Sequence, residues 1–210
     1  MKRISIMVLF ILSLVGGLLT APAPAALIVD TGHSNNTSLL SGTYPGFAAE
    51  FTLSQPSTIT NISSWMYHSG GSNSLTAAIY TDGGNVPGAV YNNVNAYSVT
   101  FAIPEKPPGM YGTPGWYGPT ALNWYLPAGT YWAVIRPISD TQYGQAYPST
   151  SPPGPIPTGN ALYYLGSWAQ APASYNLAWQ INANPVPLPA AFWLLCSGLI
   201  GLIGIRRFRK

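Results

Sequence analysis

The last 25 residues constrain the chain most, because they read as a targeting segment rather than as part of a fold. They open on VPLP at 186–189, where two prolines fix φ and force extended geometry, so no helix continues through this point from upstream. The run 190–205 then holds sixteen residues without a charge. As a helix it would extend about 24 Å, just short of the roughly 30 Å hydrocarbon core of a bilayer. Four cations follow, which favours a cytoplasmic C-terminus and an external body.

This order of motif, apolar helix and basic cluster resembles the PEP-CTERM sorting signal of Gram-negative bacteria, and the spacing V-P-L-P-A-A-x-W-L-x-x-S-G-L-x-G-L-x-G is similar to one of its subtypes. The resemblance covers about the last 25 residues. It implies that exosortase, a membrane-embedded transpeptidase-like enzyme, recognises the motif, removes the tail and passes the protein to the cell exterior. Leu188 stands where the family has its name-giving glutamate.

The residues that carry this resemblance fall into three groups. The sorting motif is Val186, Pro187, Leu188 and Pro189; the membrane helix is marked by Ala190, Trp193, Gly198, Gly201 and Ile205; the basic stop-transfer cluster is Arg206, Arg207, Arg209 and Lys210. A plain single-span anchor is the alternative. A permanent anchor needs no VPLP and is usually longer, so the sequence favours a sorting signal at 185–210.

The first 25 residues have the three parts of a secretory signal peptide. A positive start, Met1–Arg3, precedes an apolar segment at 4–19 and then a stretch of small residues. Ala23 and Ala25 suit a signal peptidase, with the cut before Ala26. The expected partners are therefore the Sec translocon and signal peptidase, with the inner membrane holding the protein before processing.

The body between these ends, 26–184, differs from the whole chain in charge. The formal charge of the chain is +3, but Lys106 and Arg136 are the only cations of the body against five carboxylates, which makes it −3. Nucleic-acid binding needs clustered cations, so this class of partner is excluded. The body contains no cysteine, so no disulfide supports it, and about 160 residues are enough for one domain with a sizeable core.

Alternation of apolar and polar residues predicts about nine strands in the body and no helix. The expected strands are 47–53, 58–67, 75–80, 89–91, 97–103, 122–126, 130–135, 161–165 and 177–181. Polar, Gly-rich residues at 68–73 are expected to form a turn, and 104–119 and 142–160 to be long loops. The predicted fold is all-β, an antiparallel, jelly-roll-like β-sandwich, flanked by an N-terminal signal helix and a C-terminal transmembrane helix.

Two turn motifs carry a second resemblance. I-Y-T-D-G-G-x-x-P-G-x-x-Y, followed at a distance by L-P-A-G-T-Y-W, resembles the β-sandwich ectodomains of sorted or anchored bacterial surface proteins. Asp82 and Asn85 lie in the first motif and could offer oxygens to calcium. An Asx turn without metal is the favoured alternative, because a second carboxylate is missing from this stretch. No cofactor is expected.

Groups for catalysis are scarce in the body. Its histidines, His33 and His68, belong to no nucleophile or metal-ligand motif, and the five carboxylates occur in no context typical of glycoside hydrolysis. The sequence therefore predicts that the protein is not an enzyme. A secreted hydrolase is the third and weakest alternative.

Aromatic residues near the loops are the more informative candidates, because exposed rings can stack on sugars. The candidate glycan contacts are Tyr111, Trp116, Tyr117 and Trp168. The alternative is that such rings cover the ends of the sandwich, which is the interpretation preferred for Trp124 and Trp132.

Together these features predict an exported surface or extracellular-matrix protein with a structural or adhesive role in exopolysaccharide or biofilm. A cell-surface carbohydrate-binding module is the alternative, with exopolysaccharide as the partner in either case.

Overall fold

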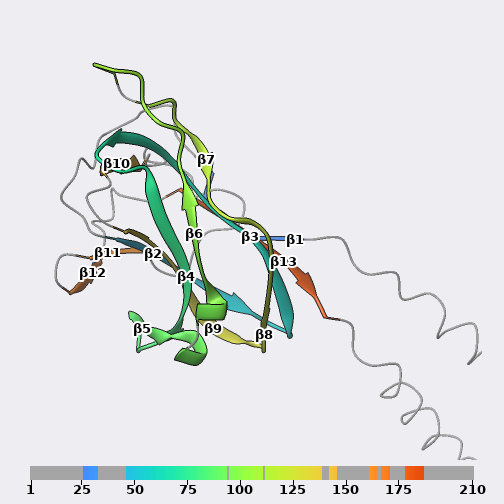
Figure 1. Ribbon diagram of the computed structural model, residues 1–210. Helices are drawn as coiled ribbons and strands as arrows, with labels where there is room; N and C mark the ends of the chain where they lie inside the picture. The colour runs from blue at the N-terminus through green and yellow to red at the C-terminus, as the bar shows by residue number, and fades with distance from the viewer. Residues whose placement is uncertain are drawn as a thin grey trace, which may run out of the picture. The chain divides into compact units, whose positions relative to one another are not determined.

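The fold is known from a computed structural model that describes residues 26–32, 46–93, 95–110, 112–138, 142–145, 161–164, 167–170 and 178–186. Within these residues the chain forms thirteen β-strands and two short 3-10 helices, η1 (Tyr91–Asn93) and η2 (Asn95–Tyr97), all inside one compact unit, Ala25–Pro185 (Figure 1). None of the described residues forms a helix with the length and hydrophobicity needed to cross a bilayer.

The strands form two sheets in which every described pairing is antiparallel. The first sheet contains β1 (Ala26–Asp30), β3 (Ser57–Gly70), β7 (Gly115–Tyr117), β8 (Thr120–Leu126), β10 (Gln142–Gln145) and β13 (Trp179–Pro185). The second contains β2 (Phe47–Leu53), β4 (Ser74–Asp82), β5 (Pro87–Val90), β6 (Ser98–Ala102), β9 (Gly129–Pro137), β11 (Ala161–Tyr164) and β12 (Trp168–Gln170).

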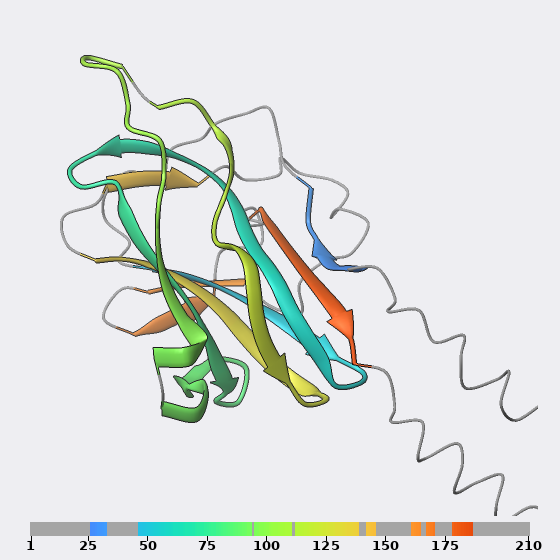
Figure 2. The same cartoon turned by 45° about the vertical axis from the view of Figure 1, so that its right-hand side comes forward.

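The long strand β3 is the centre of the first sheet. β13 and then β1 lie along one side of it, and β8 and β7 follow each other along the other side. Met66 pairs with Gly115 of β7 and with Gln145 of β10, so these two short strands flank the far end of β3 on opposite sides. Figure 2 shows the blue β1, the orange β13, the cyan β3 and the olive β8 side by side.

In the second sheet the order is β12-β11-β2-β9-β4, and β6 and β5 share the free side of β4. Alternation decides which face of this sheet is buried. In β2, Phe47, Ala49, Phe51 and Leu53 belong to the main core, while Glu50 and Thr52 lie on the other face. This confirms the alternation predicted from the sequence.

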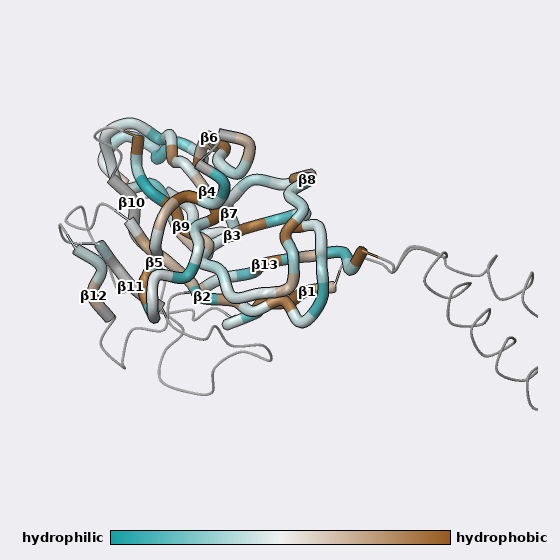
Figure 3. Tube along the Cα trace, turned by 90° about the horizontal axis from the view of Figure 1, so that it is seen from below, coloured by the Kyte–Doolittle hydropathy of each residue, from teal (hydrophilic) through white to brown (hydrophobic). Residues whose placement is uncertain are grey.

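One hydrophobic core joins the two sheets. Ile59, Ile62, Met66, Trp179 and Ile181 come from the first sheet, and Phe47, Phe51, Leu75, Ile79 and Ile135 from the second; all are nearly inaccessible to solvent. Hydrophobic residues, drawn brown in Figure 3, are accordingly interspersed with hydrophilic ones along the strands. The all-β prediction of two antiparallel sheets is confirmed, while the two flanking helices lie outside the described residues.

Several predicted boundaries were wrong. β7 lies inside the predicted loop 104–119 and β10 inside 142–160; three or four residues are too few to show a period, and both strands exist because β3 offers them a pairing edge. His68, predicted to lie in a turn, belongs to β3 and is buried, because the backbone satisfies both of its ring nitrogens. The last strand continues to Pro185, which can end a strand without donating to the ladder.

Gly118 lets the chain pass from β7 to β8 in contact with β3. Pro119 accepts a hydrogen bond from the Ile62 amide at 3.2 Å, which holds the connection against the strand. A Cβ atom at Gly118 would overlap the carbonyl oxygen of Ile62 and lie 2.8 Å from the Cα of Ser63. A glycine is therefore required here by contact with the backbone of β3.

Candidate functional site

The outer face of the second sheet, away from the core, brings an arginine together with aromatic rings. Because Ala133 and Ile135 of β9 point into the core, Trp132, Val134 and Arg136 point outward. Register then aligns one row across the sheet: Trp168 pairs with Tyr164, the Tyr164 amide bonds to Gly46 at 2.9 Å, and Thr76 pairs with Arg136. We call Tyr80, Arg136, Tyr164 and Trp168 the arginine–aromatic face.

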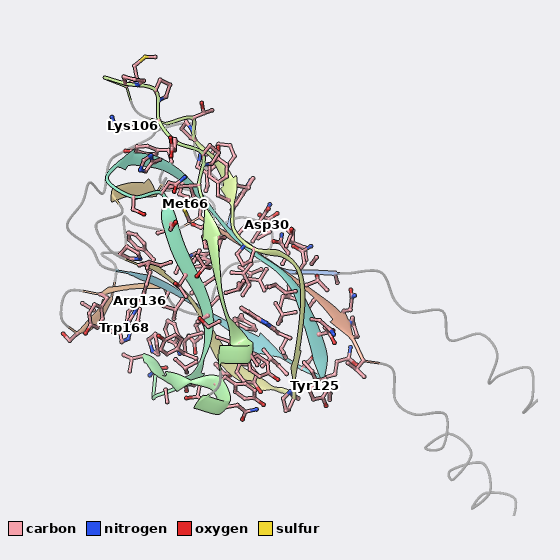
Figure 4. All side chains as sticks on the ribbon, in the orientation of Figure 1. Asp30, Met66, Lys106, Tyr125, Arg136 and Trp168 are labelled. Carbon is pink, nitrogen blue, oxygen red and sulfur yellow. The ribbon has the colours of Figure 1, made fainter. Side chains whose placement is uncertain are left out.

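Three rings surround the guanidinium of Arg136. Its Cζ lies 4.6 Å from the ring centroid of Tyr164, 5.2 Å from that of Trp168 and 5.8 Å from that of Tyr80. Each distance is within the range of a cation–π interaction. Figure 4 shows Arg136 beside Trp168. These contacts come from three strands, β4, β11 and β12, so only the folded sheet assembles them.

The missing side chain at Gly46 makes room for Arg136. A Cβ at this position would lie 2.9 Å from Cγ of Arg136 and 3.4 Å from its Nε. The arginine therefore lies across the start of β2 toward the rings of β11 and β12. Any larger residue at Gly46 would displace it.

The side-chain N–H donors of Arg136 have no hydrogen-bond acceptor among the described residues. Its Nε is buried without an acceptor, and within the described part of the chain the side chain forms no hydrogen bond and no ion pair. Cζ of Arg136 lies over the three rings, and the five N–H donors of a guanidinium lie in its own plane. In addition to the buried Nε–H, the other donors of the guanidinium have no acceptor among the described residues.

A hollow of about 230 Å³ lies beside this arginine. Its lining combines apolar groups with three hydroxyl-bearing residues and the arginine: Thr76, Ala78, Tyr80, Val90, Ser98, Val134, Arg136 and Pro137. Clefts for drug-sized ligands measure roughly 300–1,000 Å³, so this hollow suits a smaller group, about one ring. The arrangement can hold a polar ring with an apolar face and place a negative group at the guanidinium.

Trp132 packs beneath the side chains of the arginine–aromatic face. It is fully buried in a small second cluster with Ala48 and Val134, and Tyr80 and Trp168 pack against this cluster. Its Nε1 donates to Asp82 Oδ1 at 3.1 Å. The same oxygen accepts from the amides of Gly84 at 3.3 Å and Asn85 at 3.1 Å, so Asp82 forms an Asx turn.

The metal alternative at this turn has no further support in the described residues. They contain no group of three or more His, Cys, Asp and Glu side chains placed to hold an ion. Asn85 has a φ of 66°, the left-handed conformation that asparagine tolerates in such turns.

The three predicted glycan contacts that the structure describes come from different sheets. Trp168 belongs to the arginine–aromatic face, but Trp116 packs edge-on against Trp65 in the first sheet, with centroids 5.6 Å apart. Tyr117 is in the same strand as Trp116 and donates to the Thr113 carbonyl at 2.9 Å. Tyr111 lies outside the described residues. Sequence reasoning missed Arg136, although a lone cation in an apolar strand was a usable signal.

His68 acts within the fold. Its Nδ1 accepts the Lys106 amide at 3.2 Å, so Nε2 carries the hydrogen and faces the carbonyls of Gly70 at 2.9 Å and Ser72 at 3.2 Å. The ring thereby ties the end of β3 to the loop after β6. His33 lies outside the described residues.

Tyrosines close one end of the core. Tyr91 packs edge-on against Tyr97 at 4.8 Å and against Tyr131 at 5.6 Å between ring centroids. Burial raises the pKa of Tyr97 and Tyr131, and repulsion from Tyr91 raises each pKa further. Both phenols also donate to backbone carbonyls, those of Tyr125 and Pro127. This is the packing role predicted as the alternative for aromatic residues; Trp124 packs in the same core, while the buried Trp132 packs in the second cluster.

The residues predicted to form the two targeting segments fall almost wholly outside the described residues. Ala26 starts β1 and is exposed, and Val186, the first residue of the predicted sorting motif, is exposed directly after β13. The structure describes neither Ala23 and Ala25 nor any residue after Val186.

A scan against protein-family models found no match, and searches of curated proteins and of solved structures found none either.

Proposed function

We propose that the protein is an exported surface or extracellular-matrix protein of a Gram-negative bacterium, with an adhesive or structural role in exopolysaccharide. The two apolar ends support the route: a signal peptide for the Sec translocon and signal peptidase, and a tail read by an exosortase-type transpeptidase after an inner-membrane intermediate. The body is the part that remains outside.

Within this proposal the sandwich is a jelly roll between a signal helix and a transmembrane helix. The order of strands supports it. One sheet contains β1-β13-β3-β8 and the other β2-β9-β4-β6, and the chain changes sheet at every step between these eight strands except from β4 to β6. Two interlocked Greek keys have this arrangement.

Carbohydrate binding is the second candidate, and the arginine–aromatic face favours it. The observation that carries it is the hollow beside Arg136, with hydroxyls from Thr76 and Ser98 and an apolar floor from Ala78 and Val134. A sugar ring presents C–H groups on its faces and hydroxyls at its edge, so it needs both kinds of contact. Binding of this kind is also a physical basis for adhesion to exopolysaccharide.

Affinity electrophoresis of the full chain in mild detergent, through gels containing different polysaccharides, tests this role. We expect retardation by at least one polysaccharide, and Trp168→Ala should remove it. Trp116→Ala is the matched control, because it deletes the same side chain from the other sheet and should leave retardation unchanged. Unaltered migration on every polysaccharide would eliminate glycan binding.

A further inference from the structure

We infer that the hollow beside Arg136 is a subsite for an acidic sugar, so that the ligand is a polysaccharide containing uronate carboxylates. The inference rests on the proposed glycan binding and names its chemical class. Its first support is the state of Arg136, which is half-buried, surrounded by rings and without an ion pair among the described residues.

None of the four described carboxylates, Asp30, Glu50, Asp82 and Glu105, forms an ion pair with Arg136, and Glu105 is in the loop after β6. Asp30 is in the first sheet, where it accepts from the Gly32 amide at 3.0 Å, and the Oδ1 of Asp82 accepts three N–H groups. Glu50 is on the same outer face, but it is four residues along β2 from Gly46, which is about 13 Å at 3.3 Å per residue. The positive charge of Arg136 therefore has no described counter-ion.

The donor geometry of Arg136 fits a carboxylate better than a neutral hydroxyl. Three rings lie around the guanidinium, and the terminal N–H groups of an arginine match the two oxygens of a carboxylate in a bidentate pair. Partial burial strengthens such a pair relative to one in bulk water. A neutral sugar would satisfy the same donors with weaker hydrogen bonds.

The length of the row favours a polymer over a small free acid. Trp168, Tyr164, Arg136 and Thr76 are in four strands of the sheet, and Gly46, directly before β2, lies in the same row between Tyr164 and Arg136. Four spacings of about 4.8 Å between strands give roughly 19 Å, several sugar units long. The hollow holds one ring beside Arg136, and Tyr164 and Trp168 can contact the units that follow.

Because the body between residues 26 and 184 is negatively charged overall, long-range electrostatic attraction cannot explain its binding to a polyanion. Between residues 26 and 184 the net charge is −3, and the other cation, Lys106, is in the loop after β6. Binding to a polyuronate must then come from contacts at Arg136. This separates a specific carboxylate subsite from general charge attraction.

The test compares one polymer in two charge states. The full chain in mild detergent is titrated with polygalacturonate and with its fully methyl-esterified form, and the dissociation constants are compared. We expect at least tenfold tighter binding of the acid, equivalent to about 1.4 kcal/mol. Free galacturonate should compete for the site, and glucose at the same concentration should not.

Three variants test whether the affinity for polygalacturonate depends on Arg136. Arg136→Gln should lose at least tenfold of the affinity for polygalacturonate, and Lys106→Gln, which removes the same charge elsewhere, should lose none. Gly46→Ala keeps the charge but displaces the arginine, so it should weaken binding several-fold. Thermal unfolding of each variant shows that the sheet is intact.

The outcomes are separable. Equal affinity for the acid and the ester, or full affinity in Arg136→Gln, overturns the carboxylate subsite while glycan binding stands. Equal losses in Arg136→Gln and Lys106→Gln also overturn it, since they would indicate general charge attraction. Absence of binding to either polymer and to all neutral polysaccharides overturns glycan binding itself.

Discussion

Two fully buried tryptophans offer a matched test of how hydrogen bonding contributes to this fold. Trp132 and Trp179 are both inaccessible to solvent. The Nε1 of Trp132 donates to Asp82 at 3.1 Å, whereas the Nε1 of Trp179 has no acceptor among the described residues. Replacing each by phenylalanine removes the same atoms but changes the polar contacts differently.

The packing loss is similar at both positions. The smaller ring leaves about 40 Å³, worth about 1 kcal/mol at roughly 24 cal/mol per Å³, and the lost transfer free energy adds about 1 kcal/mol. At Trp179 the substitution also removes an unpaired buried donor, whose desolvation destabilises the folded state by about 1–3 kcal/mol. This gain offsets the packing loss, so the free energy of unfolding changes by about zero. At Trp132 the substitution removes a hydrogen bond worth about 1 kcal/mol, so the total loss is about 3 kcal/mol.

Equilibrium urea unfolding followed by circular dichroism measures this difference. We expect Trp132→Phe to lower the free energy of unfolding by about 3 kcal/mol more than Trp179→Phe, with the same dependence on urea concentration. In a thermal scan that corresponds to a midpoint roughly 6–12 °C lower. Equal losses in the two variants would refute the reasoning that a buried unpaired donor destabilises this core.

Two further predictions concern backbone contact and pH. Gly118→Ala should lower the free energy of unfolding by at least about 3 kcal/mol, because the added Cβ would overlap backbone atoms that cannot rotate away. Gly109→Ala, where φ is 73° and the added Cβ would meet open space, should lower it by only about 1 kcal/mol. Equal losses in urea unfolding would contradict this. Since burial raises the pKa of Tyr97 and Tyr131 in the folded state, their contribution to stability is complete below pH about 10 and declines as the pH rises through the folded values. Thermal midpoints across this range, compared with tyrosinate absorbance, check the sign, and a midpoint that rises would contradict it.

The sequence predicts the parts of the fold that alternation determines. Phe47, Phe51, Leu75 and Ile135 lie in the core because each strand has one apolar face, and a one-residue shift would expose all of them. Short strands such as β7 and β10 lack a readable period and depend on the pairing edge of β3. Their positions are set by pairing with β3 in the folded chain and cannot be predicted from the sequence.

The candidate site was largely hidden from sequence reasoning for a similar reason. Trp168 was identified by its ring, but its neighbours depend on the register of β12 against β11 and of β11 against β2. Arg136 joins them only because Gly46 is across the ladder from it. His68 was predicted to lie in a turn because its backbone partners, the Gly70 carbonyl and the Lys106 amide, follow no pattern that can be recognised in the sequence.

The most direct test of the account is where the chain ends after export. Intact mass spectrometry of the protein recovered from cells and from the culture matrix gives both termini at once. The account predicts a mature N-terminus at Ala26 and a new C-terminus within Val186–Pro189. A chain that still ends at Lys210 in the recovered protein would contradict it.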